Sequence, residues 1–164
     1  LESVTSELKE NLASELLDEI MKLTPTAFEH LVLDVMKAMG YGTDYEATSQ
    51  SRDEGIDGVI LEDKLGFDRI YVQAKLWERS RTVARPDIQA FVGAIAGRGG
   101  KGLFVTTAKF SQGAVEYARS QHIILIDGMK LAECMIEYNF GVTVKRTYEI
   151  KAVDTDVFAD YQEL

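Results

Sequence analysis

Two short runs carry the residue types in this chain that could do chemistry. Gly55-Ile56-Asp57-Gly58 supplies a carboxylate, and Val72-Gln73-Ala74-Lys75 supplies an amide oxygen and an amine. Each run lies in an apolar, strand-like segment, and the turn-like stretch 62–66 separates them, which predicts a β-hairpin. A carboxylate, a second oxygen ligand and a lysine that meet at strand ends can hold a hard cation against a phosphodiester and activate water beside it. The two runs therefore predict hydrolysis of nucleic acid.

The alternation of side chains along a strand predicts which of these residues share a face. Asp57 should point with Val59, and Gln73 with Lys75, because strand side chains repeat with period two. A hairpin centred near 64–65 would bring Asp57 to the Gln73 to Lys75 end of its partner. Lys75 follows an apolar run in what should be a central strand, where a lysine needs a carboxylate or a ligand. Two structural explanations stay open: a cross-strand salt bridge between Asp57 and Lys75, and a simple turn at 55–58.

Periodicity and capping signals predict the elements that must position these residues. We expect helices at about 6–22, 25–39, 86–96, 112–121 and 128–139, and strands at about 43–48, 56–62, 68–76, 103–107, 123–127 and 142–152. Ser6 is the expected cap of the first helix, and Thr24 or Thr26 that of the second. An antiparallel hairpin followed by βαβ crossovers predicts the α/β class, as a single domain with a mixed central β-sheet flanked by helices.

The composition is that of an ordinary folded domain. The 164 residues are 46% hydrophobic and 27% charged, enough to bury a core and too apolar for disorder. Cys134 is the only cysteine, which excludes an internal disulfide and a thiolate zinc cage. No stretch approaches the roughly 20 apolar residues that span a bilayer, and the start has no secretory pattern, so we expect a cytoplasmic protein.

The charge is distributed unevenly. The net charge of −9 opposes a nucleic-acid partner, but residues 64–109 contain nine Lys or Arg and three acidic residues. A basic segment beside the candidate site is typical of a surface that contacts a phosphate backbone. Chance clustering of surface charge remains the alternative. On the first reading, Arg79, Arg81 and Arg85 extend from the site along the DNA, and Gln89, one turn into the helix after Pro86, reaches the site or the backbone or else lies on a solvated face.

Six stretches in a fixed order resemble the catalytic domain of Mrr-type restriction endonucleases, within the PD-(D/E)xK nuclease superfamily. They are Phe28-Glu29-His30-Leu31-Val32, Gly55-Ile56-Asp57-Gly58, Val72-Gln73-Ala74-Lys75, Phe91-Val92-Gly93-Ala94, Phe104-Val105-Thr106-Thr107 with Phe110-Ser111, and Leu125-Ile126-Asp127-Gly128. The resemblance covers about residues 24–140. It implies a restriction-endonuclease-like fold with a mixed four-stranded core sheet, and Mg²⁺-dependent hydrolysis of DNA, often directed against methylated foreign DNA.

Carried over by position, the resemblance gives each site residue a role. Asp57 matches the metal-binding aspartate, Lys75 the motif lysine and Glu29 the helix glutamate that completes the site. Asp57, the Gln73 amide oxygen and the Ala74 backbone carbonyl would hold Mg²⁺, or Mn²⁺ in its place. Gln73 stands where the wider superfamily has Asp or Glu, and the Mrr branch resembles this sequence in having Gln there. Ile56 replaces the motif proline. Glu29 has one alternative, a capping box closed from Thr26.

The expected function is thus a divalent-metal-dependent endonuclease that acts on double-stranded DNA, with a homodimer as one option for its assembly. A non-catalytic DNA-binding or assembly module with the nuclease fold, and a nuclease of DNA repair or junction processing, are the alternatives. We expect a linker helix at 1–22, a catalytic domain at 23–152 and an acidic tail at 153–164. Mrr proteins usually carry an N-terminal DNA-recognition domain, so the resemblance implies one upstream in the full-length protein.

Overall fold

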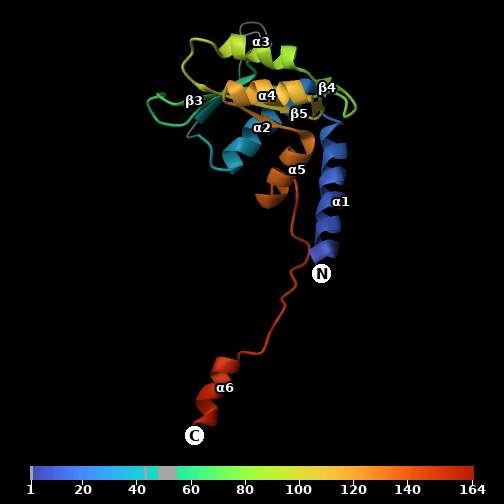
Figure 1. Ribbon diagram of the computed structural model, residues 1–164, viewed down its shortest axis with the longest axis vertical. Coiled ribbons are helices and arrows are strands. Elements are labelled where there is room, and N and C mark those ends of the chain that lie inside the picture. Colours follow the sequence, from blue (N-terminus) through green and yellow to red (C-terminus); the bar gives the residue numbers. More distant parts are fainter. Residues whose placement is uncertain (1, 43, 48–54) are drawn as a thin grey trace.

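A five-stranded sheet forms the centre of the computed structural model, which describes residues 2–42, 44–47 and 55–164 (Figure 1). The strands are β1 (Asp44–Ala47), β2 (Gly58–Leu61), β3 (Arg69–Lys75), β5 (Lys101–Thr106) and β7 (Ile123–Ile126), in the order β1-β2-β3-β5-β7. β1, β2 and β3 are antiparallel, whereas β3, β5 and β7 are parallel. The predicted mixed sheet is confirmed, with five strands in place of the four that the resemblance implies. Residues 43 and 48, the predicted ends of the first strand, lie outside the described residues.

Helices cover both faces of this sheet, and the last helix in chain order lies away from it. The helices are α1 (Glu2–Ile20), α2 (Pro25–Ala38), α3 (Arg85–Ile95), α4 (Gln112–Ser120), α5 (Gly128–Glu137) and α6 (Thr155–Gln162). On one face α1, α2 and α5 enclose an apolar cluster that takes Ile70, Val72 and Ala74 from β3. On the other, α3 and α4 enclose a second cluster that takes Tyr71. Both faces of β3 are therefore buried, which explains its nearly continuous apolar sequence. Within the described residues, no helix is long and apolar enough to cross a membrane.

Two very short strands were not predicted from the sequence. β4 (Thr82–Val83) and β6 (Lys109–Phe110) pair in parallel as a separate small sheet. Each follows the carboxyl end of a central strand, β3 and β5 respectively. Two-residue strands have too little sequence to show a period, so only the three-dimensional arrangement reveals them.

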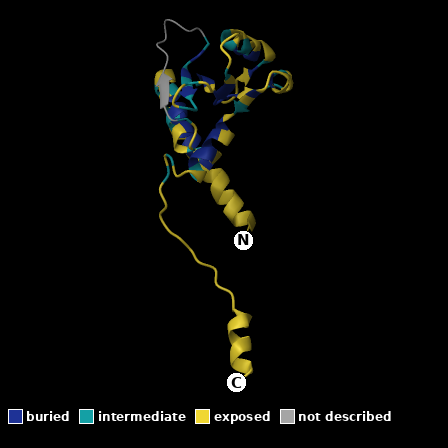
Figure 2. Cartoon of the chain, turned by 90° about the vertical axis from the view of Figure 1, so that its left-hand side faces the viewer, coloured by how far each residue is buried: buried dark blue, intermediate teal, exposed yellow. Residues whose placement is uncertain are grey.

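Helix α1 packs along only half of its length. Its C-terminal half buries Ala13, Leu16, Leu17 and Ile20 in the cluster with α5, whereas its N-terminal half is exposed (Figure 2). Ser6 lies inside the helix, so the prediction that it caps the helix is wrong. The proposed division at residue 22 stays a prediction, but the second half of α1 contributes to the same core as the strands.

The C-terminal segment differs most from expectation. Residues 142–152 form no strand, and every residue from 143 to 164 is exposed. The chain leaves the body of the domain after α5 and ends in α6, which the Asp154 side chain caps through the amide of Asp156 (Figure 1). The alternation that predicts a strand at 142–152 is present, but a strand needs a neighbour, and here the segment has none within the described chain.

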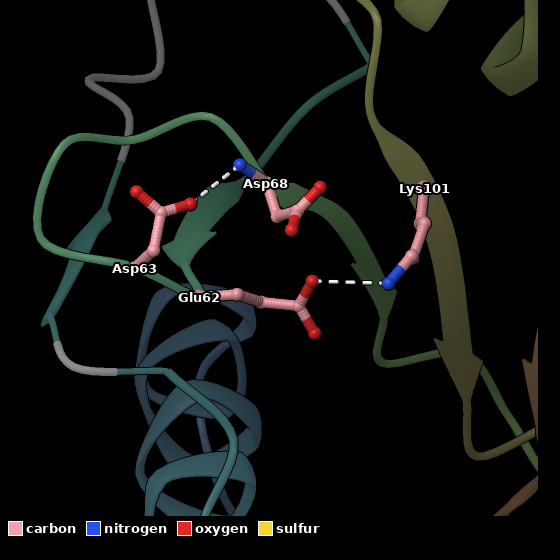
Figure 3. Close-up of polar contacts among 4 residues, drawn as sticks. All are labelled: Glu62, Asp63, Asp68 and Lys101. Carbon is pink, nitrogen blue, oxygen red and sulfur yellow. Dashed lines mark hydrogen bonds and ion pairs between the residues drawn. The ribbon is translucent and has the colours of Figure 1, made fainter.

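The loop that joins β2 to β3 lies at the end of the hairpin remote from Asp57. The Asp63 carboxylate accepts backbone hydrogen bonds from Leu65, Phe67 and Asp68, and these bonds lower its pKa. Figure 3 shows the bond from Asp68. Nearby, Lys101 at the start of β5 forms a 3.0 Å ion pair with Glu62. These contacts fix the hairpin turn and therefore the register of its two strands.

Candidate active site

Asp57 lies immediately before β2, opposite the carboxyl-terminal end of β3. The register pairs Gly58 with Val72, and the Asp57 amide donates a 2.8 Å hydrogen bond to the Val72 carbonyl. This register confirms the hairpin centred near 64–65. The Asp57 Oδ2 atom accepts a 2.7 Å hydrogen bond from the Ala74 amide. The Asp57 side chain thus provides the acceptor that the backbone of a longer β2 would have offered to Ala74. The carboxylate is held at the end of the β2–β3 ladder.

Glu29 reaches the same point from helix α2. Thr24 is the N-cap of this helix and accepts a 3.1 Å hydrogen bond from the Ala27 amide, so the capping box proposed from Thr26 is wrong. Instead, Glu29 lies close enough to Asp57 for the negative charge of Asp57 to raise the pKa of Glu29. The Thr26-x-x-Glu29 stretch, which suggested a capping box, therefore places the Glu29 carboxyl group beside that of Asp57.

The absence of a side chain at Gly58 allows this approach. A Cβ atom on Gly58 would lie 2.8 Å from the side chain of Leu33, which is one helical turn beyond Glu29 on α2. Any larger residue would push the helix away from β2. Gly55, at φ +91°, provides the turn that leads into Asp57. The two glycines of the Gly-Ile-Asp-Gly run thus have separate roles: one turns the chain, and the other admits α2.

The paired carboxyl groups hold their protons more firmly than isolated ones. Burial raises the pKa of Asp57, against the opposing effects of the Ala74 amide, the Lys75 charge and the Glu29 side chain. Burial also raises the pKa of Glu29, and the negative charge of Asp57 raises it further. A bound cation would relieve both effects, because it compensates the desolvation and the repulsion together.

Lys75 ends strand β3 and is half-buried. Its charge lowers the pKa of both carboxyl groups, so it lies within electrostatic reach of the pair. No ion pair joins Lys75 to Asp57 among the described residues, and the simple cross-strand salt bridge left open above is not observed. The Lys75 ammonium group thus lies near two carboxyl groups without a direct ion pair to Asp57. Its N–H donors remain able to bind a further acceptor.

Two buried threonines hold the end of β3. The Thr106 hydroxyl donates a 2.8 Å hydrogen bond to the Lys75 carbonyl, and the Thr107 amide donates one of 3.3 Å to the same oxygen. The Thr107 hydroxyl donates to the Trp77 carbonyl. Both side chains are buried. Neither threonine was predicted to have a role. The signal in the sequence is a pair of polar residues that ends an apolar strand.

The Gln73 side chain lies on the face of the sheet opposite to the face that α2 covers. It is 6% exposed, and its amide nitrogen lies 4.0 Å from the position that a Cβ atom on Gly55 would occupy, beside Ala94 of α3. No hydrogen bond joins Gln73 to Asp57 or Glu29 in the part of the chain that the structure describes. Its role as a metal ligand stays a prediction.

The residues expected to contact DNA follow β3 at the same end of the sheet. Arg79 forms a 3.4 Å ion pair with Asp18. Arg81 stacks 3.6 Å from the centre of the Trp77 ring, and Arg85 lies 4.9 Å from that of Tyr117. Gln89 is exposed on α3.

The basic segment 64–109 does not form one surface. Lys101 begins β5, and Arg69 begins β3, so both lie at the end of the parallel strands opposite to Lys75. Only part of the basic segment can therefore contribute to a surface around the carboxyl pair.

The donor atoms suit a hard divalent cation. Two carboxyl groups converge, and the Ala74 carbonyl points to the same side of β3 as its amide, toward Asp57, because the amide and carbonyl of one strand residue share a direction. Oxygen donors of this kind bind Mg²⁺. Among the described residues no group of three His, Cys, Asp or Glu side chains gathers, so a third protein ligand would have to be an amide or carbonyl oxygen.

A comparison with known families shows the family of the chain. A family model described as a restriction endonuclease, Mrr_cat, matches residues 20–135, which include Glu29, Asp57, Gln73 and Lys75. The chain belongs to this restriction endonuclease family. It is also 41% identical, over 163 residues, to the type IV methyl-directed restriction enzyme EcoKMrr of Escherichia coli strain K12. That match covers 96% of the chain and 53% of the relative, so the chain spans about half the length of the E. coli enzyme.

Solved structures show the same fold. The MspJI restriction endonuclease, determined in complex with a 27-mer oligonucleotide, is 28% identical with a TM-score of 0.58, over 79% of this chain and 33% of that one. AspBHI, a DNA modification-dependent restriction endonuclease, is 16% identical with a TM-score of 0.64, over 79% of this chain and 36% of that one. The fold is therefore that of the restriction endonucleases, as the order of the six stretches indicates.

Proposed function

We propose that this domain is a divalent-metal-dependent endodeoxyribonuclease, with Mg²⁺ as the natural ion and Mn²⁺ able to replace it. The observation that supports this most is the convergence of Asp57, Glu29 and Lys75 at the carboxyl end of β3. Burying two acids side by side raises their pKa, which costs stability unless a cation or proton lies between them. This arrangement favours a catalytic metal site over a non-catalytic module.

The residues divide the work of phosphodiester hydrolysis. A divalent cation bound there would polarise the phosphoryl oxygen and acidify a water molecule. Asp57 would hold it directly, together with the Ala74 carbonyl and the Gln73 amide oxygen, and Glu29 would hold it directly or through its bound water. Lys75 would orient the attacking water or stabilise the developing negative charge. Thr106 and Thr107 would keep the Lys75 backbone in place.

The proposed substrate is double-stranded DNA, and the proposed role is restriction of modified foreign DNA. The methyl-directed E. coli relative supports this choice, and its greater length supports a separate DNA-recognition region in the whole protein. Arg79, Arg81, Arg85 and Gln89 are proposed to contact the DNA. Cutting both strands needs two active sites, so we propose that two copies act together.

A plasmid-nicking assay tests the activity. Methylated and unmethylated supercoiled plasmids are incubated with the protein, with and without Mg²⁺. We expect Mg²⁺-dependent nicks, faster on methylated DNA if this domain contributes to the discrimination. Lys75→Ala should bind DNA normally and cut it at least about a hundredfold more slowly. Lys101→Ala, which removes a lysine at the opposite end of the sheet, is the matched control and should cut normally. DNA binding without cleavage under all metal conditions would favour the non-catalytic module.

A further inference from the structure

Strand β7 leaves one edge of the central sheet open. It pairs with β5 on one side and is last in the strand order. Its other side faces no strand within the described residues, and Ile124 is 62% exposed there. An edge strand with an exposed apolar residue presents unpaired amide and carbonyl groups that can accept another strand. Such edges are usually covered or protected by charge.

Hollows lie on both sides of this edge. One, of about 750 Å³, lies toward α4 and is lined by Phe110, Val115 and Arg119, among others. A second, of about 480 Å³, lies toward α2 and α5 and is lined by Met39, Ile70 and Cys134, among others. Ile124 and Leu125 line both hollows. A strand added beside β7 would send its alternating side chains into one hollow and then the other.

The C-terminal segment has the pattern of such a strand and no partner. Val144, Tyr148 and Ile150 occupy positions of one parity, and their exposed fractions are 69%, 81% and 80%. Residues 143–164 contain no glycine or proline. A run of this kind has the pattern of an extended strand and carries no residue that would favour a tight turn back onto its own domain.

Charge matches only the end of the segment to the surface beside the edge. Residues 152–164 contain four acidic residues and no basic one, whereas the run 143–152 contains Lys145, Arg146 and Lys151 and one acidic residue, Glu149. The hollow toward α4 is lined by Lys109, Arg119 and Lys130, opposed by the single carboxylate of Asp127. The acidic end of the segment would therefore be attracted to the surface beside β7.

Residues 143–164, here called the tail, lead away from their own domain, which favours a second copy of the chain as the acceptor. Gly141 lies between Leu16 of α1 and Met135 of α5, and the chain then runs away from the body of the domain in both views (Figures 1 and 2). An extended run over 143–152 spans about 30 Å at roughly 3.3 Å per residue. We propose that residues 143–164 of one copy dock on the β7 edge of a second copy, with 143–152 as an added strand, and that the exchange is reciprocal.

This proposal does not depend on the nuclease activity, and cross-linking tests it directly. In a Cys134→Ala background, one chain carries Ile124→Cys and a differently tagged chain carries Tyr148→Cys. After mixing, a short thiol-specific cross-linker should give a covalent dimer that contains both tags. Phe67→Cys, in the β2–β3 loop, replaces Ile124→Cys as the control and should give none, although Phe67 is 81% exposed and Ile124 62%. A further variant carries both Ile124→Cys and Tyr148→Cys in one chain. Cross-links that form only within that single chain would overturn the proposed exchange.

Light scattering on the full chain provides a second measure. We expect the wild type to have twice the 18.3 kDa mass of one chain. Tyr148→Gly and Ile150→Gly should each give the mass of one chain, because each removes an apolar side chain from the hollow and weakens the added strand. Phe67→Gly should leave the dimer unchanged. A monomeric wild type, or a dimer that survives both tail substitutions, would show that the tail does not hold two copies together.

Discussion

Asp57 Oδ2 accepts the amide proton of Ala74 at 2.7 Å, so a side chain terminates the β2–β3 ladder at the point where the site begins. This hydrogen bond directly joins the two runs predicted to form the site, residues 55–58 and 72–75. It also gives Asp57 a structural role besides its proposed catalytic one, since the Ala74 amide would otherwise lose its partner at the end of β3.

This dual role changes what a substitution should do. Asp57→Ala should abolish cleavage and also destabilise the fold by about 1–2 kcal/mol, because the Ala74 amide loses its acceptor. Asp57→Asn keeps an oxygen acceptor and should abolish cleavage with a smaller loss of stability. Thermal melting, Mg²⁺ titration calorimetry and plasmid nicking would be measured for both. Full activity in the Ala variant would exclude Asp57 as a metal ligand.

The second prediction concerns the buried amide. Gln73→Glu places a carboxylate at a position that is 6% exposed. Without metal it should lower the melting temperature, because burial opposes the charge. If Gln73 is a ligand, Mg²⁺ or Mn²⁺ should bind more tightly than in the wild type and restore that stability. The control is Gln89→Glu on the exposed surface of α3, which should change neither property. A Gln73→Glu variant that metal does not restabilise would indicate that the side chain points away from the ion.

The third prediction concerns the support of Lys75. Thr106→Val removes the hydrogen bonds to the Lys75 carbonyl and from the Ala108 amide. The free energy of unfolding should fall by about 1–3 kcal/mol. Cleavage should slow by on the order of tenfold while DNA binding is kept, since a misplaced lysine affects the reaction more than the grip. The exposed Thr143→Val is the control. Equal losses of binding and cleavage would point to a general structural defect.

The fourth prediction follows from the raised pKa values of Glu29 and Asp57. A carboxyl group whose pKa is higher in the folded state binds protons more tightly there, so its contribution to stability is lost as pH rises through that pKa. In metal-free protein, Glu29→Gln should therefore raise the melting temperature at pH 7 by roughly 1–3 °C, a small effect because Glu29 is partly exposed. The difference should shrink toward pH 3. Glu10→Gln, on the exposed half of α1, should show no such pH-dependent gain.

The sequence predicts the hairpin, the βαβ order and the meeting of Asp57 with the Lys75 end, because strand alternation and turn signals act over a few residues. It leaves Glu29 undecided, since Thr26-x-x-Glu29 reads equally as a cap, and only the packing of Leu33 against Gly58 shows where α2 lies. The segment 142–152 is the opposite case, because the sequence predicts a strand there that the structure does not contain. Its alternation is real, but whether a strand forms depends on a neighbour that local sequence does not contain.

The last prediction separates the grip on DNA from the cutting of it. Arg79, Arg81 and Arg85 have exposed charges held near Asp18, Trp77 and Tyr117, so replacing all three with alanine should leave the fold intact. Each lost phosphate contact releases fewer counterions and should lower the salt slope of binding by roughly 0.9. The control removes three charges at the opposite end of the sheet, Lys64, Arg69 and Lys101, and should leave the slope unchanged.

Fluorescence anisotropy across a salt series would give both slopes, beside nicking assays for Lys75→Ala. The arginine variant should bind every sequence more weakly, whereas Lys75→Ala should bind normally and not cut. If the two triple variants have the same slope as the wild type, neither end of the sheet supplies the main phosphate contacts. The DNA would then be held by another part of the whole protein, and this domain would contribute the carboxyl pair and Lys75 alone.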